Sequence, residues 1–248
     1  MEIRGVRQIV RFNWPFYAAA GVALVAVECG LRFAPTTPMT RWVMHGVTGL
    51  AAVWIVGSLI ASWVIYDRSP LSRWEWIRGA LTLHPRRWIN VHAGLDESTP
   101  ALCRFLAPSE GRVFDIFDPD EMSEPSIVRA RRLCRPEVDP ERVDFHHLPA
   151  PPQSIDAAFL LLSAHELRTD AARRTFFAEL HRILSPDGSV IVAEHLRDWA
   201  NFGAFGPGFL HFFSRRTWAR CFARARFVIE REFSITPFIR VFVLRRCV

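Results

Sequence analysis

Two long apolar runs near the N-terminus dominate the hydrophobic pattern of the chain. The first covers residues 16–33 and reads FYAAAGVALVAVECGLRF, and the second covers residues 42–66 and reads WVMHGVTGLAAVWIVGSLIASWVIY. A helix needs about 20 mostly apolar residues to cross the hydrocarbon layer of a bilayer. We therefore expect two transmembrane helices in an anchor formed by residues 1–69. A cleaved signal peptide is the alternative for the first run, but no small-residue cleavage site stands out before the second.

Arginines flank this pair of runs mainly on one side, with only Arg32 and Arg41 at the margins of the connecting loop. The others precede the first run and follow the second at Arg4, Arg7, Arg11, Arg68, Arg73 and Arg78. The connecting loop, APTTPMT, is uncharged, so the positive-inside rule predicts that both ends lie in the cytoplasm. The expected location is the inner cell membrane, multi-pass, with the C-terminal domain in the cytoplasm. Glu28 and His45 are ionisable residues within the runs and are candidates for function, although both could reach the headgroups instead.

Residues 70–87 connect the anchor to the rest of the chain and include the segment RWEWIRGALTLHPRR. Its tryptophans and aliphatic residues alternate with arginines in a way that predicts an amphipathic connector lying in the membrane interface. The alternative is an ordinary helix that packs on the following domain, and the pattern alone does not separate the two.

From residue 88 to residue 248 the pattern changes to short apolar strands that alternate with amphipathic helices. We expect strands over 88–91, 112–117, 142–145, 155–162, 189–194, 227–235 and 238–244, and helices over 98–105, 125–133, 170–184 and 214–225. The run after Asp156 is apolar throughout, as in a strand buried on both faces. The turn at Thr236-Pro237 is too short for a crossover, so the last two strands must be antiparallel. The predicted fold class is therefore α/β, with a mostly parallel sheet and an antiparallel last strand, preceded by two transmembrane helices.

The stretch from Val143 to His195 is the most informative part of this domain. It contains a polar segment ending in Leu148-Pro149, a buried strand, an amphipathic helix, a Pro-Asp-Gly turn and a strand ending in Glu194-His195. This order resembles the second half of a class I S-adenosylmethionine-dependent methyltransferase of the quinone- and lipid-modifying type. The closing antiparallel hairpin is also typical of that family. The resemblance implies a Rossmann-like sheet over residues 88–248 and S-adenosylmethionine as the cofactor.

The first loop of this domain departs from the family pattern. Methyltransferases of this class have an acidic residue and three glycines there, which let the backbone approach the methionine part of the cofactor. This chain has Asn90, His92, Gly94 and Asp96 in those places. The resemblance implies that Asn90, His92 and Gly94 line the cofactor site. Either the loop takes another shape, with Asp96 or Glu97 pairing the cofactor ammonium, or cofactor binding is lost.

Two further acids are candidates for the cofactor site. Asp118 follows the second predicted strand, where a carboxylate can accept hydrogen bonds from ribose hydroxyls. A turn cap within Asp-Pro-Asp is the alternative. The resemblance assigns Asp144 to the adenine amino group, and a solvated loop acid is the alternative there.

Histidines after two strands are candidates for the chemistry of methyl transfer. His165 follows the buried strand, His195 ends the next one, and His211 could join them from a flap in GPGFLHFF. Histidine is the natural general base near neutral pH, so His165 and His195 are the predicted catalytic residues. Histidines bonded to the backbone at strand ends are the alternative. The spacing of the histidines matches no metal motif and HELRT is not HExxH, so no metal ligands are predicted. A metal site is the minor alternative, with possible ligands at His146, His147, His165, His195 and His211.

Composition excludes several other functions. The net charge is +6, but the basic residues, all arginine, form no stripe interleaved with aromatics, which argues against nucleic acid as a partner. The five cysteines are far apart and form no CxxC, which indicates reduced thiols in a cytosolic compartment.

The favoured hypothesis is a membrane-anchored methyltransferase, with the lipid bilayer and a lipophilic small molecule as its partners. A catalytically inactive methyltransferase-like scaffold protein is the alternative, motivated by the altered glycine loop. A small transporter component is a third, which would require oligomerisation because two helices cannot enclose a path. The sequence leaves the oligomeric state open.

Overall fold

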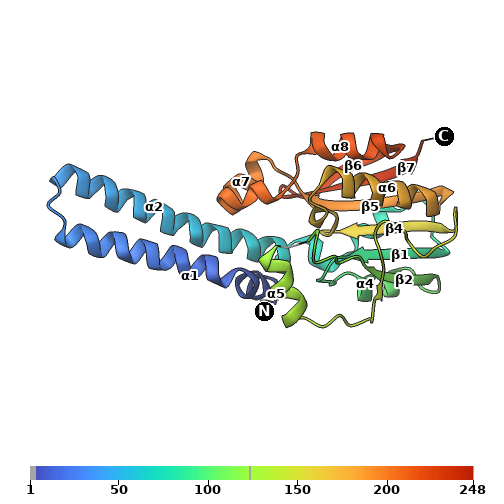
Figure 1. The fold of residues 1–248 in the computed structure, drawn as a ribbon, viewed down its shortest axis with the longest axis horizontal. Helices are drawn as coiled ribbons and strands as arrows, with labels where there is room; N and C mark the ends of the chain where they lie inside the picture. Colours follow the sequence, from blue (N-terminus) through green and yellow to red (C-terminus); the bar gives the residue numbers. More distant parts are fainter. Residues whose placement is uncertain (1–3, 123, 248) are drawn as a thin grey trace.

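The computed structural model describes residues 4–122 and 124–247, and shows a helical hairpin that projects from an α/β domain (Figure 1). The hairpin consists of α1 (Arg4–Phe33) and α2 (Pro38–Trp63), which lie side by side. The 26 residues of α2 extend about 39 Å at 1.5 Å per residue. Both helices are long and apolar enough to cross a membrane, as expected from the two apolar runs. The first helix starts earlier than the predicted run, because residues 4–15 continue it through a polar segment.

Close contacts between η1 (Val64–Arg68) and the start of α1 join the hairpin to the domain. The chain forms this short π-helix directly after α2. The carboxylate of Asp67 in η1 accepts hydrogen bonds from the backbone N–H groups of Gly5 (2.7 Å) and Val6 (2.9 Å). This carboxylate satisfies donors that the start of α1 would otherwise leave free. Gly5 lies against Tyr66, where an added Cβ would be 2.5 Å from the Tyr66 Cβ. The two ends of the hairpin are therefore held together where it meets the domain.

The connector packs on the sheet and not in a separate interfacial position. It forms η2 (Pro70–Arg73) and α3 (Trp76–Ala80), and Leu71 and Ile77 are buried in the same apolar cluster as strand residues. Arg231 of the sheet donates hydrogen bonds to the carbonyls of Gly79 and Ala80. The structure thus favours the second interpretation of this segment, a helix packed on the following domain.

The sheet has seven strands in the order β3-β2-β1-β4-β5-β7-β6. Their bounds are β1 Arg87–His92, β2 Glu110–Asp115, β3 Glu141–Arg142, β4 Ile155–Leu161, β5 Leu184–His195, β6 Phe227–Thr236 and β7 Ile239–Arg246. The first five strands pair in parallel, whereas β7 is antiparallel to both β5 and β6. The predicted mostly parallel sheet with an antiparallel end is confirmed.

Helices cover both faces of this sheet. They are α4 Thr99–Phe105, α5 Pro125–Leu133, η3 Ala164–Glu166, α6 Asp170–Ile183, α7 Trp199–Phe205, η4 Gly206–His211 and α8 Arg215–Arg224. Phe177 and Trp218 from α6 and α8 belong to the core cluster of one face, and Leu102 and Ile77 from α4 and α3 belong to that of the other. The central strands are therefore buried on both sides, in agreement with their continuous apolar sequence.

Three predicted boundaries are wrong. Strand β5 begins at Leu184, so the Pro186-Asp187-Gly188 segment is an irregularity within a strand and not a turn before it. Ile155 pairs with Leu184 whereas Ala157 already pairs with Ser189, so the extra residues are looped out without ending the pairing. Strand β3 has only two residues. Strand β2 ends at Asp115, two residues before the predicted end, and this shift changes which carboxylate lies at the strand end.

Candidate functional site

The carboxyl ends of β1, β4 and β5 meet at one edge of the sheet, where ligands bind in open α/β folds. His92 ends β1, the single turn η3 follows β4, and Glu194 and His195 end β5. The segment α7–η4 follows β5 and brings His211 back to this edge. The structure therefore places most of the sequence-predicted site residues within one region.

The first loop has a shape of its own, held by Asn90 and Asp96. The Asn90 amide donates hydrogen bonds to Ser98 Oγ (2.9 Å), Thr99 Oγ1 (2.8 Å) and Asp96 Oδ1 (3.2 Å). Asp96 Oδ1 also accepts from the backbone N–H groups of Ser98 and Thr99, each at 3.0 Å. Asp96 thus accepts from the backbone at the start of α4, and Asn90 binds the side chains of the same loop and holds it together. Neither is directed to a cofactor ammonium in this conformation.

His92 replaces a glycine of the family pattern and is buried in this loop. In the described part of the chain, neither of its ring nitrogens has a hydrogen-bond partner. Burial lowers the pKa of His92, so the ring is neutral at neutral pH. A cavity of about 70 Å³ adjoins it, lined in part by Asn90, Leu95 and Leu161. Ligand pockets have volumes of about 300–1,000 Å³, so this cavity alone does not accommodate a nucleotide-sized cofactor.

Arg131 of α5 lies over Gly94 and reaches the end of β2. An added Cβ at Gly94 would be 2.8 Å from Arg131 Cγ and 3.0 Å from Ile127 Cγ1, so these side chains occupy the space beside the glycine. The Arg131 guanidinium donates two hydrogen bonds to Asp115, at 2.8 and 2.7 Å, and a third to the Ala93 carbonyl at 3.2 Å. Asp115 is 5% exposed. The Arg131 guanidinium therefore occupies the position in which ribose hydroxyls would contact Asp115.

The two acids expected to contact the nucleoside are not at the strand ends. Asp118 lies three residues beyond the end of β2, and its Oδ1 accepts a hydrogen bond from the Asp120 backbone N–H at 2.9 Å, which is the turn cap named as the alternative. Asp144 follows β3 and accepts from the backbone and the ring of His146, each at 2.8 Å, with its side chain 65% exposed. Asp115 was not predicted from the sequence, because the predicted second strand ended at Phe117, two residues after the observed end of β2.

These contacts test whether the residues present fit S-adenosylmethionine. The types of donor and acceptor fit, since a carboxylate ends β2 and a glycine remains in the first loop. The space does not fit, because Arg131 and Ile127 fill the concavity beside Gly94. In this conformation the cofactor site is closed by α5, and we derive no transfer step through it.

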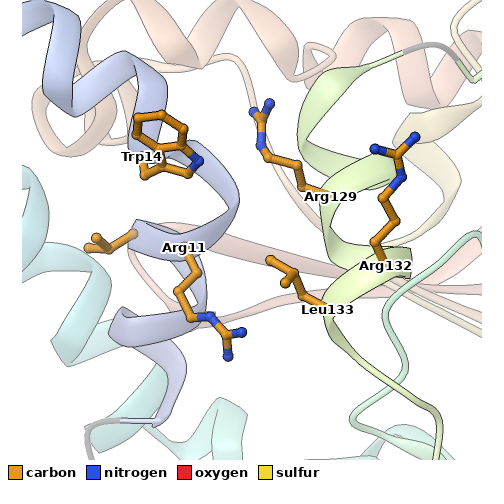
Figure 2. Close-up of a pocket in the computed structure, with 6 residues that line it drawn as sticks. Arg11, Trp14, Arg129, Arg132 and Leu133 are labelled. Carbon is orange, nitrogen blue, oxygen red and sulfur yellow. The ribbon is translucent and has the colours of Figure 1, made fainter.

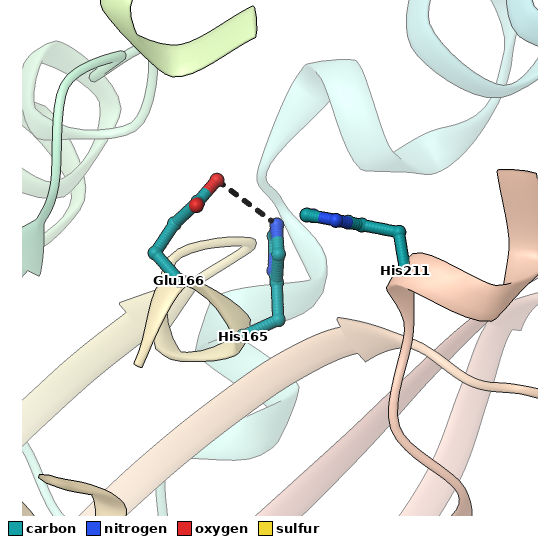
Figure 3. Close-up of side chains that lie close together, drawn as sticks. All are labelled: His165, Glu166 and His211. Atoms are coloured by element: carbon teal, nitrogen blue, oxygen red, sulfur yellow. Dashed lines mark ion pairs between the residues drawn. The ribbon is translucent and has the colours of Figure 1, made fainter. Parts of the chain in front are cut away.

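A second group of polar side chains surrounds His165. Its Nδ1 lies 2.7 Å from Oε2 of Glu194, which is fully buried, and its Nε2 lies 3.4 Å from Oε1 of Glu166 (Figure 3). Burial alone would lower the pKa of His165, but the two carboxylates outweigh it and raise that pKa to about 10. His165 thus carries both ring protons at neutral pH, which does not suit the predicted role of general base.

His211 lies beside this pair. Its ring centroid is 5.1 Å from that of His165, with the planes nearly perpendicular (Figure 3). Its Nδ1 is 3.6 Å from Oε1 of Glu124. Burial, together with the charge of His165, lowers the pKa of His211 to about 4. His165, Glu166 and His211 each offer a ligand atom within 4.8 Å of the others. His211 thus lies beside His165 at the end of η4.

His195 is a buried link between the anchor and the sheet. Its Nε2 accepts a hydrogen bond from the Tyr66 hydroxyl at 2.7 Å, and its Nδ1 lies 3.0 Å from both Asn201 Oδ1 and the Phe238 carbonyl. Burial lowers the pKa of His195 to about 4. Both ring nitrogens are thus engaged within the protein. This arrangement does not suit the predicted catalytic role and matches the alternative of a structural histidine at a strand end.

A further cavity lies away from this edge of the sheet. It has a volume of about 470 Å³ and lies between α1 and α5, lined by Val10, Arg11, Trp14, Arg129, Arg132 and Leu133 (Figure 2). The guanidinium of Arg11 points away from those of Arg129 and Arg132, so the three charges do not converge on one point. Arg129 donates to the Phe12 carbonyl of α1. The cavity therefore marks a contact between the hairpin and the helix that carries Arg131.

The segment α7–η4 connects the site to the hairpin. The Trp54 indole N–H of α2 donates to the Gly203 carbonyl of α7 at 3.0 Å, and its ring meets Phe202 edge-on at 5.3 Å. Trp199 of α7 is 84% exposed and Leu210 of η4 is 56% exposed. The segment that ends at His211 thus presents apolar side chains next to α2.

Residues 112–192 match a family model described as a methyltransferase domain. The structure is similar to a SAM-dependent methyltransferase from Aquifex aeolicus, with a TM-score of 0.54, 15% identity, and coverage of 73% of this chain and 92% of that one. The α/β domain therefore has the fold of class I methyltransferases, and part of it matches the sequence model of a methyltransferase domain. S-adenosylmethionine is accordingly its expected cofactor.

Two other solved structures show the range of proteins with this fold. The methyltransferase domain is similar to geranyl diphosphate C-methyltransferase from Streptomyces coelicolor A3(2), with a TM-score of 0.51, 13% identity, and coverage of 71% of this chain and 78% of that one. It is also similar to the cyclase SpnF, with a TM-score of 0.50, 18% identity, and coverage of 72% and 81%. No curated protein sequence matches the chain. Because one fold accommodates different reactions, the chemistry has to be argued from the site.

Proposed function

We propose that the chain is a membrane-anchored S-adenosylmethionine-dependent methyltransferase that acts on a lipophilic small molecule. The observation that carries the substrate class is the path of α7–η4, which contacts the apolar hairpin at Trp54 and ends at His211 beside the edge of the sheet. A substrate dissolved in the bilayer would meet this segment without first crossing water.

The depth of the contact on α2 supports this proposal. From residue 38 to residue 54 the helix rises about 24 Å at 1.5 Å per residue, close to the hydrocarbon thickness of about 30 Å. If the loop end of the hairpin lies at the far side of the bilayer, Trp54 lies near the cytoplasmic boundary. Exposed Trp199 then lies where tryptophan rings favour the membrane interface. The arginine distribution along the sequence supports a cytoplasmic position for the α/β domain.

The cofactor would be held by Asp115 and the first loop after Arg131 has left the strand-end carboxylate. Asp115, and not Asp118, is then the acceptor for the ribose hydroxyls, because it lies at the end of β2. Asn90, His92 and Gly94 remain the predicted lining of the methionine side, and Asp144 the predicted adenine contact.

Cofactor binding is tested by calorimetric titration of the detergent-solubilised full chain with S-adenosylhomocysteine. We expect one molecule bound per chain. In an Arg131→Ala background, where the ion pair no longer competes, Asp115→Asn should weaken binding about tenfold or more, since a hydrogen bond to a charged group is worth about 1.5–3 kcal/mol. Asp118→Asn in the same background is the matched control and should bind as its parent. The reverse ranking would restore Asp118 as the ribose ligand.

The substrate class requires a separate measurement. Membranes containing the full chain are incubated with S-adenosylmethionine labelled in its methyl group, and the label is partitioned between organic solvent, water and precipitated protein. We expect the label in the organic phase, and membranes with Arg131 intact but Asp115→Asn provide the background. Label found only in water or in protein would refute the lipophilic acceptor while leaving cofactor binding standing.

The inactive scaffold remains a second candidate, and the closed cofactor site is the observation that favours it. A scaffold has no need to reopen the site, so neither the wild type nor Arg131→Ala should then bind S-adenosylhomocysteine. Binding by Arg131→Ala alone would indicate a site that is intact but held shut.

A further inference from the structure

We propose that His165, Glu166 and His211 form a binding site for a divalent transition-metal cation of the zinc type, with the Glu194 carboxylate behind it. Their ligand atoms lie within 4.8 Å of one another, at the edge of the sheet where the acceptor would approach (Figure 3). Two of the residues follow β4 and the third ends η4, so the site exists only because the fold brings these segments together.

The spacing of the first two ligands suits a metal. Zinc binds histidine nitrogen and carboxylate oxygen at about 2.0–2.2 Å in tetrahedral geometry, which puts two ligand atoms about 3.3 Å apart. The distance from His165 Nε2 to Glu166 Oε1 is 3.4 Å. A direct hydrogen bond would draw these atoms to about 2.8 Å. The observed pair is too far apart for a strong hydrogen bond and correctly spaced for a shared cation.

The environment of His165 also suits a ligand. Metal-binding histidines usually donate the proton of their other ring nitrogen to a carboxylate, which fixes the orientation of the ring. His165 Nδ1 has this partner in Glu194 at 2.7 Å, and the Glu194 side chain is 0% exposed. This contact leaves Nε2 directed toward Glu166. Binding of a cation displaces the proton on Nε2, so the buried positive charge is exchanged for that of the metal.

Glu166 supplies an independent observation. Its side chain is 12% exposed, and its Oε2 is buried without a hydrogen-bond partner in the described part of the chain. A buried carboxylate oxygen without a partner is costly; because Oε1 is the oxygen that faces His165, coordination of the cation through both oxygens would satisfy Oε2 as well. The alternative, a Glu194–His165–Glu166 ion-pair triad with no metal, leaves this oxygen unsatisfied, and His211 then pairs with Glu124 at 3.6 Å and not with a cation.

Two histidines and one carboxylate leave coordination positions open. Structural zinc sites are closed by four protein ligands, whereas three protein ligands and an open position are typical of catalytic sites. Imidazole with carboxylate suits zinc, iron and related cations more than magnesium or calcium. The open position would take an oxygen of the acceptor, so the expected acceptor class carries a hydroxyl or another anionic oxygen group. This last step rests on the proposed function, whereas cation binding itself does not.

The test uses the tag-free full chain in detergent, stripped of metal with a chelator and titrated with Co²⁺, whose visible absorption reports its ligands. We expect one Co²⁺ per chain, displaced by Zn²⁺, and a Zn²⁺-dependent rise of the thermal unfolding midpoint. Glu166→Gln and His211→Asn should each weaken binding more than about 100-fold. Glu194→Gln should weaken it about 10- to 100-fold, as expected for a partner behind a ligand.

His147→Asn is the matched control, because His147 also lies near a glutamate but its side chain is 81% exposed. This variant should bind Co²⁺ as the wild type does. A folded wild type that takes up no Co²⁺ or Zn²⁺ would overturn the proposal and leave the ion-pair triad. Equal binding by the wild type, Glu166→Gln and His211→Asn would overturn it as well, since the ion would then lie elsewhere. Neither result depends on S-adenosylmethionine, so a failure here is distinct from a failure of the methyltransferase proposal.

Discussion

Replacing Arg131 with alanine should open the cofactor site. The guanidinium donates two hydrogen bonds to Asp115, at 2.8 and 2.7 Å, and its aliphatic part fills the space beside Gly94. A cofactor that uses Asp115 must first displace both contacts. The apparent affinity is reduced by the fraction of molecules in the open form. Removing the side chain removes that competition.

The magnitude follows from the ion pair. A hydrogen bond to a charged group contributes about 1.5–3 kcal/mol. We take the free energy of one such bond as the net cost of separating Arg131 from Asp115. The second bond is not counted, because water and the ribose hydroxyls replace part of the lost hydrogen bonding. At 1.4 kcal/mol for each factor of ten, Arg131→Ala should bind S-adenosylhomocysteine about 10- to 150-fold more tightly than the wild type.

The same change should destabilise the unliganded protein. Asp115 is 5% exposed and loses its cation, and breaking a buried pair from one side costs about 3–5 kcal/mol. The Arg131 side chain is 22% exposed, so we expect the lower end of this range. The thermal unfolding midpoint should therefore fall without ligand and recover more steeply with S-adenosylhomocysteine than that of the wild type.

Calorimetric titration measures the affinity, and tryptophan fluorescence on heating measures the stability. Arg132→Ala is the matched control, because Arg132 is the next residue on α5 and is exposed. It should change neither quantity appreciably. If Arg131→Ala is folded and binds no more tightly than the wild type, the guanidinium does not close the site. Weaker binding would identify Arg131 as a ligand of the cofactor itself.

Three further predictions concern the junction, the buried histidine and the membrane face. Gly5→Ala places a Cβ 2.5 Å from that of Tyr66, so overpacking should cost about 1–3 kcal/mol and lower the unfolding midpoint; an unchanged midpoint would show that the junction is loose. Burial lowers the pKa of His195 from 6.5 to about 4. Its contribution to the free energy of unfolding is therefore complete above pH 6.5 and is lost as the pH falls to 4, by up to about 3 kcal/mol. His195→Gln should flatten the acid limb of the midpoint–pH curve, and identical limbs would contradict this assignment. A spin label at position 199 in nanodiscs should be more accessible to oxygen than to a polar nickel reagent. A label at Val228, a surface position of β6, should show the opposite preference. The same accessibility at both positions would argue against membrane contact by Trp199.

Much of the architecture could be predicted because it depends on local patterns. Apolar runs long enough to span a bilayer identified the hairpin, and the continuous apolar strand after Asp156 identified the buried centre of the sheet. The short turn at Thr236-Pro237 required an antiparallel pair, and β6 and β7 form one. The sequence pattern mispredicts the structure where one local motif is compatible with two structures. Pro186-Asp187-Gly188 is typical of a turn, but here the strand continues through it, because Ile155 pairs with Leu184 and the extra residues are looped out.

The candidate site was predictable in its location and not in its contacts. The sequence by itself determined a two-helix hairpin, an α/β sheet of methyltransferase type and a set of histidines and acids at the strand ends. Only the tertiary structure decided that Arg131 pairs with Asp115, that Asn90 and Asp96 bind Thr99 at the start of α4, and that Tyr66 reaches His195.

The physical reason is the difference between local and distant interactions. The period of apolar residues is set by the geometry of one helix or strand and can be read from neighbouring positions. The pKa of a side chain and its partners depend on charges brought together from distant segments. His165, Glu166 and His211 come from two loops that are far apart in the sequence, and only the order of strands places them on one edge.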